Sequence, residues 1–182
     1  MNVPLRLGQI YLPPSVKRKR LKQLFELTAD AFGSGAPRME GISLDKILER
    51  YARFTREEAE KLIARPEDWE KVRERLYRNA FTLGCELRKA YRIKTRREIL
   101  LMGRIIYKVV KIDFRGDGAC GIVVRRCFFS IYYSAEVCAL ISAFDEGMMA
   151  GLTSGLRLRF FEKITEGNDC CRAHLGNEES AS

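Results

Sequence analysis

The sequence has few of the residue patterns that mark common catalytic centres. It holds a single histidine, His174, so a Ser-His-Asp mechanism has little support. It has neither a G-x-x-x-x-G-K-[ST] loop nor a strand-linked G-x-G-x-x-G, and we therefore expect no nucleotide cofactor. It also has no C-x-x-C pair, so any evidence for a metal site comes from the wider spacing of its cysteines.

Long apolar runs are absent as well. Runs such as Ala139–Phe144 and Ile99–Met102 are far too short to cross a bilayer. The first residues lack the basic-then-apolar order of a secretory signal. We therefore expect a cytoplasmic protein without a membrane partner. Hydrophobic residues make up 46% of the chain, which provides for a packed core and excludes global disorder.

Charge is distributed unevenly along the 182 residues. The net charge is +9, but residues 1–110 hold 25 Lys and Arg against 14 Asp and Glu, whereas residues 111–182 hold 8 against 10. The basic stretches Lys17–Lys22 and Arg92–Arg97 suit either contacts with phosphate backbones or solvated helix ends. No helix-turn-helix, zinc-finger or aromatic RNA-binding signature accompanies them, so we do not expect a nucleic-acid partner.

Apolar residues repeat every three to four positions through the first 110 residues, which predicts a helical layer. Two capping boxes, Thr55–Glu58 and Thr95–Glu98, and the caps and breakers between them define the expected helices. These are 15–32, a second helix from Ser43, a third over 55–64, a long helix over 66–91 and a last one over 95–110. Residues 1–14 are expected to be irregular, since they end in two prolines.

The pattern changes after residue 110. Strands are expected at 111–115, 121–129, 156–165 and 170–175, with turns at 117–118 and 166–169 and a helix over 135–152. We therefore predict an α+β fold, in which an N-terminal helical layer precedes β-β-α-β-β and one helix packs across a small antiparallel sheet. The helical region, 1–110, and the cysteine-bearing unit, 111–176, are expected to form one compact domain with a disordered tail at 177–182.

Five of the six cysteines lie in the slightly acidic second part. A reducing compartment argues against disulfides, so metal ligation or reactive thiols become the functional alternatives. Four of them occupy a strand end, the first turn of a helix and a hairpin exit: Cys127, Cys138, Cys170 and Cys171. These positions can converge at one sheet edge, where a helix N-terminus lowers a thiol pKa and thiolates hold zinc or an iron–sulfur cluster. The alternative is that cysteines pack as small buried hydrophobes, which we expect of Cys85 and Cys120.

Asp145 is the acidic residue of most interest in the second part. It lies seven residues after Cys138, so both project from the same face of the expected helix. A carboxylate on an apolar helix face is costly to bury. Asp145 therefore suits a general base, a support for a metal ligand or a partner for Arg125 or Arg126, and the alternative is a solvated helix residue.

Glu162, His174 and Cys170 are secondary candidates. Glu162 falls on the apolar face of its expected strand, where a carboxylate is unusual. By strand alternation His174 shares a face with Cys170, and the two residues together suit metal ligation. A single histidine near a chain end is more often structural or exposed, and that alternative stays open.

The order of residues from Cys127 onwards resembles the C-terminal signature of the L-2-amino-thiazoline-4-carboxylate hydrolase-like family. The matching segments are Cys127-Phe128-Phe129, Glu136-Val137-Cys138, Phe144-Asp145-Glu146-Gly147, Gly151-Leu152 and Ile164–Cys171. Leu83-Gly84 and Leu87-Arg88 are similar too, so the likeness covers about residues 66–175. Arg172-Ala173 stands where the family has Asp-Phe, and Phe128 where it has proline. A weaker likeness is to the vinyl-reductase-type ligand-binding domains.

The family resemblance implies an α+β fold and hydrolytic opening of a thiazoline ring. In its register Cys171, rather than Cys170, is the family cysteine. Our first hypothesis is therefore an enzyme that hydrolyses a cyclic C–N or C–S substrate at a site made by Cys127, Cys138 and Cys171, with Asp145 as base or orienting group. A bound zinc ion or iron–sulfur cluster would assist the reaction, and without a metal Cys138 would be the nucleophile.

Two other functions stay open. The weaker likeness implies a non-enzymatic sensor or accessory domain that binds a small ligand or a metal in the same pocket. The basic helices allow an adaptor for nucleic acid or for another protein. The first two hypotheses share a small-molecule partner, and the oligomeric state stays open, a homodimer included.

Overall fold

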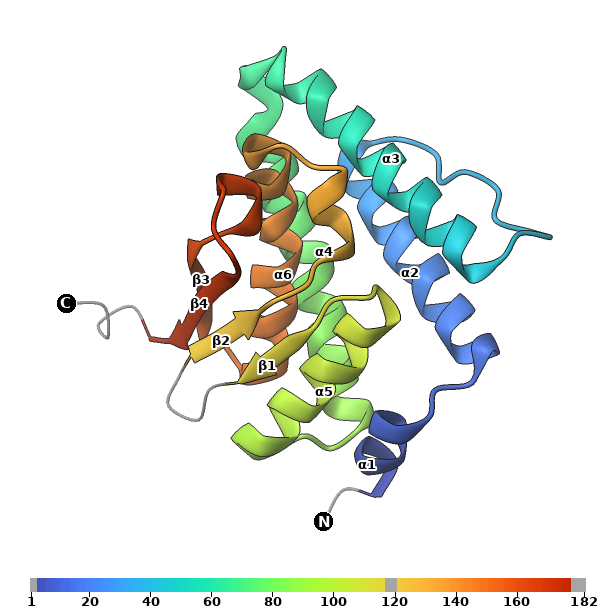
Figure 1. The fold of residues 1–182 in the computed structure, drawn as a ribbon, viewed down its shortest axis with the longest axis vertical. Helices are drawn as coiled ribbons and strands as arrows, with labels where there is room; N and C mark the ends of the chain where they lie inside the picture. The colour runs from blue at the N-terminus through green and yellow to red at the C-terminus, as the bar shows by residue number, and fades with distance from the viewer. Residues whose placement is uncertain (1–2, 117–120, 178–182) are drawn as a thin grey trace.

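A computed structural model describes residues 3–116 and 121–177, drawn as a ribbon in Figure 1. Within these residues the α-helices are α1 (Val3–Ile10), α2 (Pro14–Phe32), α3 (Leu44–Ile63), α4 (Trp69–Ala90), α5 (Arg96–Val109) and α6 (Ala135–Thr153). The strands are β1 (Phe114–Gly116), β2 (Gly121–Val124), β3 (Arg157–Glu162) and β4 (Cys171–Gly176). Short 3-10 helices are η1 (Pro66–Asp68), η2 (Phe128–Ile131) and η3 (Ile164–Glu166). The predicted α+β class, with helices first and a small sheet after them, is confirmed.

Local signals account for several helix ends. The Thr95 hydroxyl accepts a hydrogen bond from the Glu98 N–H, and the Glu98 carboxylate accepts one from the Thr95 N–H, so the predicted capping box of α5 is confirmed. The Ser134 hydroxyl caps α6 in the same way by accepting from the Val137 N–H. Gly33 ends α2 with a φ of 70°, a left-handed conformation that glycine adopts without strain.

The helices predicted from Ser43 and over 55–64 are one continuous helix, α3, so the predicted break between them is wrong. Thr55 does not cap a helix. It is fully buried inside α3, where its hydroxyl donates to the Tyr51 carbonyl and shares a hydrogen bond with the Tyr133 hydroxyl. The same residue types that form a capping box therefore lie mid-helix here, because the threonine hydroxyl finds its partner in another part of the chain.

Residues 1–14 were expected to be irregular, yet Val3–Ile10 forms α1. Contacts distant in sequence hold this short helix on α5. The Gln9 amide donates to the Leu101 carbonyl at 2.7 Å, and Lys108 Nζ donates to the Gln9 carbonyl at 2.9 Å. Gly8 lies against Ile105, and Leu5 is fully buried. Tertiary packing rather than local propensity therefore explains α1.

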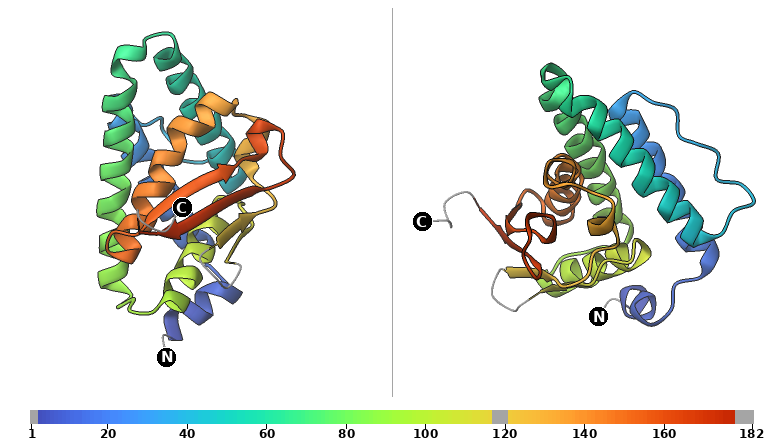
Figure 2. Two further views of the ribbon diagram at one scale, coloured as in Figure 1. Left: turned by 90° about the vertical axis from the view of Figure 1, so that its left-hand side faces the viewer. Right: turned by 45° about the horizontal axis from the view of Figure 1, so that its top comes forward.

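The four strands form one antiparallel sheet in the order β1-β2-β4-β3. Two strands are shorter than predicted, since β2 ends at Val124 before η2 and β3 ends at Glu162 before η3. In β4 the alternation buries Ala173 and Leu175 and places Cys171 on the same, inward face. The left view of Figure 2 shows β3 and β4 crossing in front of α6, with α4 beside it.

Helices α4 and α6 pack at close range through glycines. A Cβ on Gly147 would collide with the Tyr77 carbonyl oxygen, and one on Gly151 with the Phe81 carbonyl oxygen. Gly84 on α4 is likewise pressed against the Met148 carbonyl. This contact fixes one face of α6 against α4. The rest of α6 is therefore held in a set position toward α2, α5 and the sheet.

One hydrophobic core runs from Leu5 in α1 to Leu175 in β4 and includes residues of both predicted regions. Within the described residues, no helix has the length and apolar character that crossing a membrane requires. The predicted turn at 117–118, Cys120 and residues 178–182 of the predicted tail lie outside the described residues.

Candidate functional site

A cavity of about 100 Å³ lies between α2, α3, α5, η2 and α6. We call it the Asp145 cavity. Most of its wall is aliphatic or aromatic, and the polar exceptions come from α3, α5, α6 and the turns beside them. The lining side chains that carry polar atoms or sulfur are Tyr51, Tyr107, Cys127, Tyr133, Cys138, Ser142, Asp145 and Met148. Cys138, Ile141, Asp145 and Met148 therefore share one face of α6, as the helical spacing predicted.

Asp145 is the acidic group of this cavity. The Tyr107 hydroxyl donates a hydrogen bond of 2.8 Å to its Oδ1. Removal from water by the apolar surroundings raises the pKa of the Asp145 carboxyl to about 7, although the Tyr107 hydrogen bond and the charge of Lys163 oppose the rise. The half-buried carboxyl is therefore ready to gain or lose a proton near neutral pH. Its hydrogen-bonding partner is Tyr107, and neither Arg125 nor Arg126, the partners considered from the sequence.

Cys127 and Cys138 both line the cavity. Cys127 precedes η2, and burial raises the pKa of its thiol to about 12, with smaller contributions from Asp145 and the other two site cysteines. Cys138 lies in the first turn of α6, as predicted, and its N–H donates to the Ser134 carbonyl at 2.9 Å. At neutral pH Cys127 is therefore a neutral thiol rather than a thiolate.

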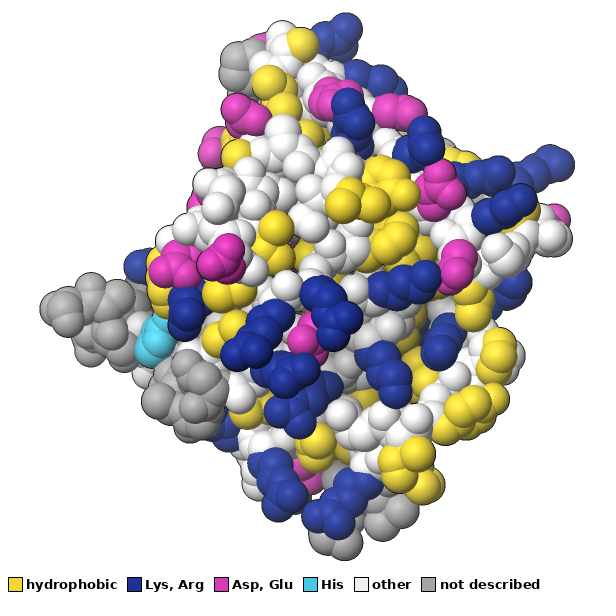
Figure 3. Space-filling view, viewed as in Figure 1, with side chains coloured by type: hydrophobic (Ala, Val, Ile, Leu, Met, Phe, Trp, Pro, Cys, Tyr) yellow, Lys and Arg dark blue, Asp and Glu magenta, His cyan; other side chains and the backbone are white. Residues whose placement is uncertain are grey.

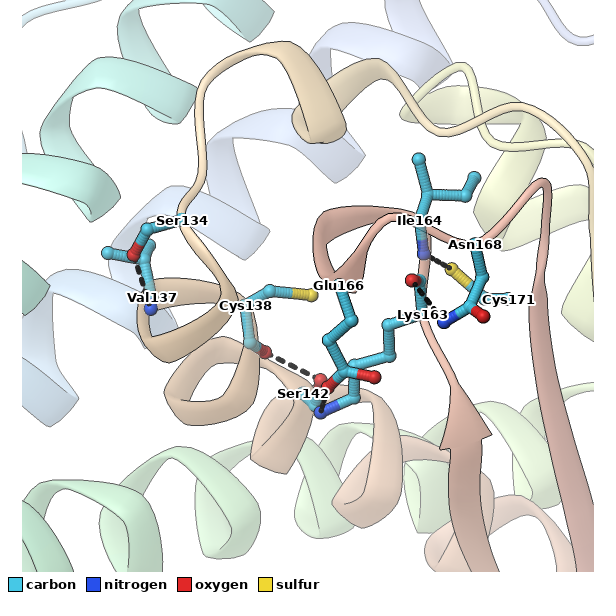
Figure 4. Close-up of polar contacts among 9 residues, drawn as sticks. All are labelled: Ser134, Val137, Cys138, Ser142, Lys163, Ile164, Glu166, Asn168 and Cys171. Atoms are coloured by element: carbon cyan, nitrogen blue, oxygen red, sulfur yellow. Dashed lines mark hydrogen bonds and ion pairs between the residues drawn. The ribbon is translucent and has the colours of Figure 1, made fainter.

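Cys171 opens β4 and faces the same region from the sheet. Figure 4 shows the Cys138 side chain pointing from α6 toward the connection between β3 and β4, where Cys171 lies. The Ile164 N–H donates to Cys171 Sγ at 3.4 Å. Burial also raises the pKa of the Cys171 thiol, with added contributions from Cys138 and Asp145. Strand end, helix start and hairpin thus bring Cys127, Cys138 and Cys171 into mutual electrostatic range.

Electrostatic range is a weaker relationship than metal ligation. In the part of the chain that the structure describes, no group of three or more His, Cys, Asp or Glu side chains is arranged to hold a metal ion. The raised thiol pKa values of Cys127 and Cys171 also disfavour the thiolates that zinc and iron–sulfur clusters need. The arrangement does not fit a ready metal centre, so we derive no step through one, and the predicted zinc or iron–sulfur cofactor stays a prediction.

The secondary candidates lie apart from the cavity wall. Glu162 forms an ion pair with Arg172 on the sheet, with Nε and Oε2 2.9 Å apart, because the register shifts between Phe160 and Glu162. His174 alternates with the inward Ala173 and Leu175, and its Nε2 is buried without a hydrogen-bond partner among the described residues. Cys170 precedes β4 and is half-buried.

Cys85 was expected to pack as a small buried hydrophobe, but it is exposed on α4. The helical pattern places it one residue beyond the buried Gly84, and the neighbouring Leu83 and Leu87 fill the buried face. Its assignment outside the site is unaffected, although the packing explanation for it was wrong.

Sequence reasoning missed Tyr107 and Lys163. Tyr107 lies on the buried face of α5 and stacks on the Phe114 ring, with centroids 4.7 Å apart. The one signal in the sequence was a tyrosine on the apolar face of an amphipathic helix. Lys163 lies between β3 and η3, and its side chain is only 15% exposed. Its Nζ is 3.9 Å from the Glu166 carboxylate. Figure 4 draws the two side chains next to each other. A mostly buried lysine near a carboxyl is recognisable only once the hairpin is folded.

No protein-family model matches this chain, and no curated protein is significantly similar to it. The resemblance to the L-2-amino-thiazoline-4-carboxylate hydrolase-like family therefore stays a prediction.

Proposed function

We propose that the protein is a small-molecule hydrolase that opens a compact cyclic C–N or C–S substrate in the Asp145 cavity. The observation that carries the proposal is the position of Asp145, a half-buried carboxyl in the wall of an otherwise largely apolar cavity. A carboxyl in such surroundings costs stability, and general acid-base catalysis is a common reason for the cost.

The size of the cavity favours a single small ring. At about 100 Å³ it is smaller than the cavity of about 150 Å³ that takes up benzene in an engineered protein. A five-membered heterocycle suits this volume better than a fused ring system. Tyr51 and Tyr133 contribute aromatic walls, and their hydroxyls are already engaged by Thr28 and Thr55. The wall thus offers mainly apolar contact around the one carboxyl.

The proposed reaction uses Asp145 as the base and then as the acid. The ionised Asp145 carboxyl takes one proton from water while the water oxygen bonds to the ring carbon of a C=N group. The π pair of that group moves to the ring nitrogen, which receives the proton from Asp145. In a second transfer the carboxylate takes the proton of the added hydroxyl as the C=O bond forms. The ring C–N or C–S bond then breaks with its electron pair on nitrogen or sulfur, and the same proton passes to that leaving atom. One water is consumed, and the carboxylate is regenerated.

Tyr107 is a positioning residue in this scheme. Its hydrogen bond to Oδ1 leaves Oδ2 for the water, and the stack on Phe114 restricts the tyrosine ring. Lys163 is not part of the cavity wall, but its positive charge opposes the rise in the Asp145 pKa. An alternative within the same function has Cys138 attack the ring carbon and Asp145 accept its proton.

The test is turnover of 2-amino-thiazoline-4-carboxylate, followed by NMR as loss of the ring signals. We expect turnover by the intact chain and loss of at least about a hundredfold in rate for Asp145→Asn, in line with removal of a general base. Asp113→Asn is the matched control, because Asp113 is paired with Arg115 outside the cavity. Turnover that is equal in the two variants would contradict the role of Asp145, and turnover that survives Cys138→Ala would exclude the cysteine nucleophile.

Ligand binding without turnover is the second candidate. The observation that favours it is the wall itself, in which the tyrosine hydroxyls and the Ser142 hydroxyl are occupied by protein partners, the latter by the Cys138 carbonyl at 2.6 Å. An apolar wall whose polar groups already have hydrogen-bond partners is sufficient to bind a ligand without chemical change, as a sensor does. Saturable binding of the same compound, with the ring intact after prolonged incubation, is the result expected for this candidate.

A further inference from the structure

A second cavity, of about 80 Å³, lies between α2, α4 and α5, and we call it the Arg20 cavity. It adjoins the Asp145 cavity across a partition formed by Leu24, Ile106, Val110, Phe144 and Met148, which line both. The Arg20 cavity is partly open, with the exposed Val16 in its wall, so a ligand can enter it from solution.

The wall of the Arg20 cavity is aliphatic over most of its extent. Leu83 and Leu87 of α4 face Met102 and Val109 of α5 across it, and the three residues Leu83, Leu87 and Met102 are buried. By comparison with the cavity of about 150 Å³ that takes up benzene, a volume of about 80 Å³ takes about three to four carbon atoms. This volume suits a single alkyl chain and is too small for a lipid with two.

Arg20, Gln23 and Tyr91 carry the polar side-chain groups of this wall. Arg20 is half-buried, and its Nη1 donates to Gln23 Oε1 at 2.9 Å. Within the described residues no carboxylate pairs with Arg20, whereas Lys22 on the same helix pairs with Glu26. A half-buried guanidinium without a counter-charge is costly unless an anion comes to it.

The position of this charge specifies the head group of the ligand. The guanidinium keeps donors beyond the one that Gln23 accepts, and the Gln23 amide N–H₂ is a further donor. One guanidinium balances one negative charge, which fits a carboxylate better than a doubly charged phosphate ester. The basic stretch Lys17–Lys22 around Arg20 adds a positive field that attracts an anion to this end of the cavity.

We propose that the Arg20 cavity binds a free aliphatic carboxylate, with its head group on Arg20 and Gln23 and its alkyl chain between α4 and α5. The chain ends at the partition, where Met148 is the unbranched side chain that adapts most easily to the end of the chain. This site differs from the Asp145 cavity in both charge and lining. It therefore does not depend on the hydrolase proposal.

The experiment is calorimetric titration of the full chain with pentanoate, beside pentan-1-ol as the uncharged probe. We expect pentanoate to bind and Arg20→Gln to weaken its binding about tenfold or more while leaving pentan-1-ol nearly unchanged. Lys19→Gln removes the same charge from an exposed position on α2 and is the matched control, with pentanoate binding expected to change less than twofold.

Two filling substitutions locate the chain. Val109 lines only the Arg20 cavity, so Val109→Phe is expected to weaken the binding of both probes. Ile141 lines only the Asp145 cavity, so Ile141→Phe is expected to leave their binding unchanged. Thermal unfolding shows whether Val109→Phe folds. If it does not, Leu87→Phe fills the same cavity from α4. The proposal fails if pentanoate does not bind, if Lys19→Gln weakens its binding as much as Arg20→Gln does, or if Ile141→Phe rather than the Val109 and Leu87 variants blocks the alkyl chain.

Discussion

The Tyr107 hydroxyl donates its hydrogen bond to Asp145 across the Asp145 cavity, joining α5 to α6 over 2.8 Å. The tyrosine ring lies parallel to that of Phe114, with an interplanar angle of 2°. Burial and the neighbouring carboxylate raise the pKa of the Tyr107 hydroxyl well above its usual value, so it remains a donor at any physiological pH. The Asp145 carboxyl is therefore the group of this pair that titrates.

The first prediction concerns stability against pH. The pKa of Asp145 is raised to about 7 in the folded chain and is about 3.9 when unfolded, so the folded state binds the proton more tightly. The free energy of unfolding contributed by Asp145 is therefore greatest below pH 4 and falls as the pH rises to 7, by up to about 4 kcal/mol. Urea unfolding of Asp145→Asn should show a smaller loss of stability between pH 4 and 8 than the parent protein. Equal pH dependence in the two proteins would mean that the carboxyl titrates normally.

The second prediction tests the positioning role of Tyr107. Its hydrogen bond lowers the Asp145 pKa, so Tyr107→Phe should raise that pKa further, by about one unit. The acidic limb of the pH–rate profile, or the Asp145 carboxyl signal in NMR, should move to higher pH by that amount. Tyr132→Phe is the control, because Tyr132 packs on Phe128 and does not line the cavity. A Tyr107→Phe protein with an unshifted profile would reduce the tyrosine to a packing role.

The third prediction concerns the thiols. Cys85 is exposed, whereas burial raises the pKa of Cys127 to about 12. Only the thiolate reacts with iodoacetamide, so Cys127 should be alkylated about a hundredfold or more slowly than Cys85 at pH 8 in the native chain. Peptide mass spectrometry of timed samples gives both rates, and the unfolded chain in urea provides the control in which the difference disappears. Rapid labelling of native Cys127 would show that its thiol is not buried as described.

Features set by neighbouring residues were predictable from the sequence. The capping box of α5 depends on Thr95 and Glu98, three residues apart, and it forms as expected. The spacing of Cys138 and Asp145 likewise placed both on one face of α6. Helical periodicity and short-range hydrogen bonds are encoded within a single turn. The local pattern predicts them except where a distant partner competes, as the Tyr133 hydroxyl does for Thr55.

Features set by distant partners were not predictable in this way. The helix α1 depends on Leu101 and Lys108, about ninety residues away, and the partner of Asp145 is 38 residues away on another helix. Glu162 left the apolar face because of a register shift that no single strand reveals. Helical spacing therefore placed Cys138 and Asp145 on one face of α6, but it did not indicate what either side chain contacts.

The last prediction concerns the contact that holds α6 in place. A methyl group at Gly147 would meet the Tyr77 carbonyl of α4, and backbone cannot move aside as a flexible side chain can. Gly147→Ala should therefore lower the free energy of unfolding by about 3 kcal/mol, although alanine favours the helix more than glycine does. It should also move Asp145, two residues away, and so weaken binding in the Asp145 cavity. The matched control is Gly35→Ala in the loop after α2, where the added methyl meets nothing within 4 Å. Chemical unfolding of the two variants compares them directly, and a Gly147→Ala protein as stable as Gly35→Ala would mean that α4 and α6 are not in such close contact.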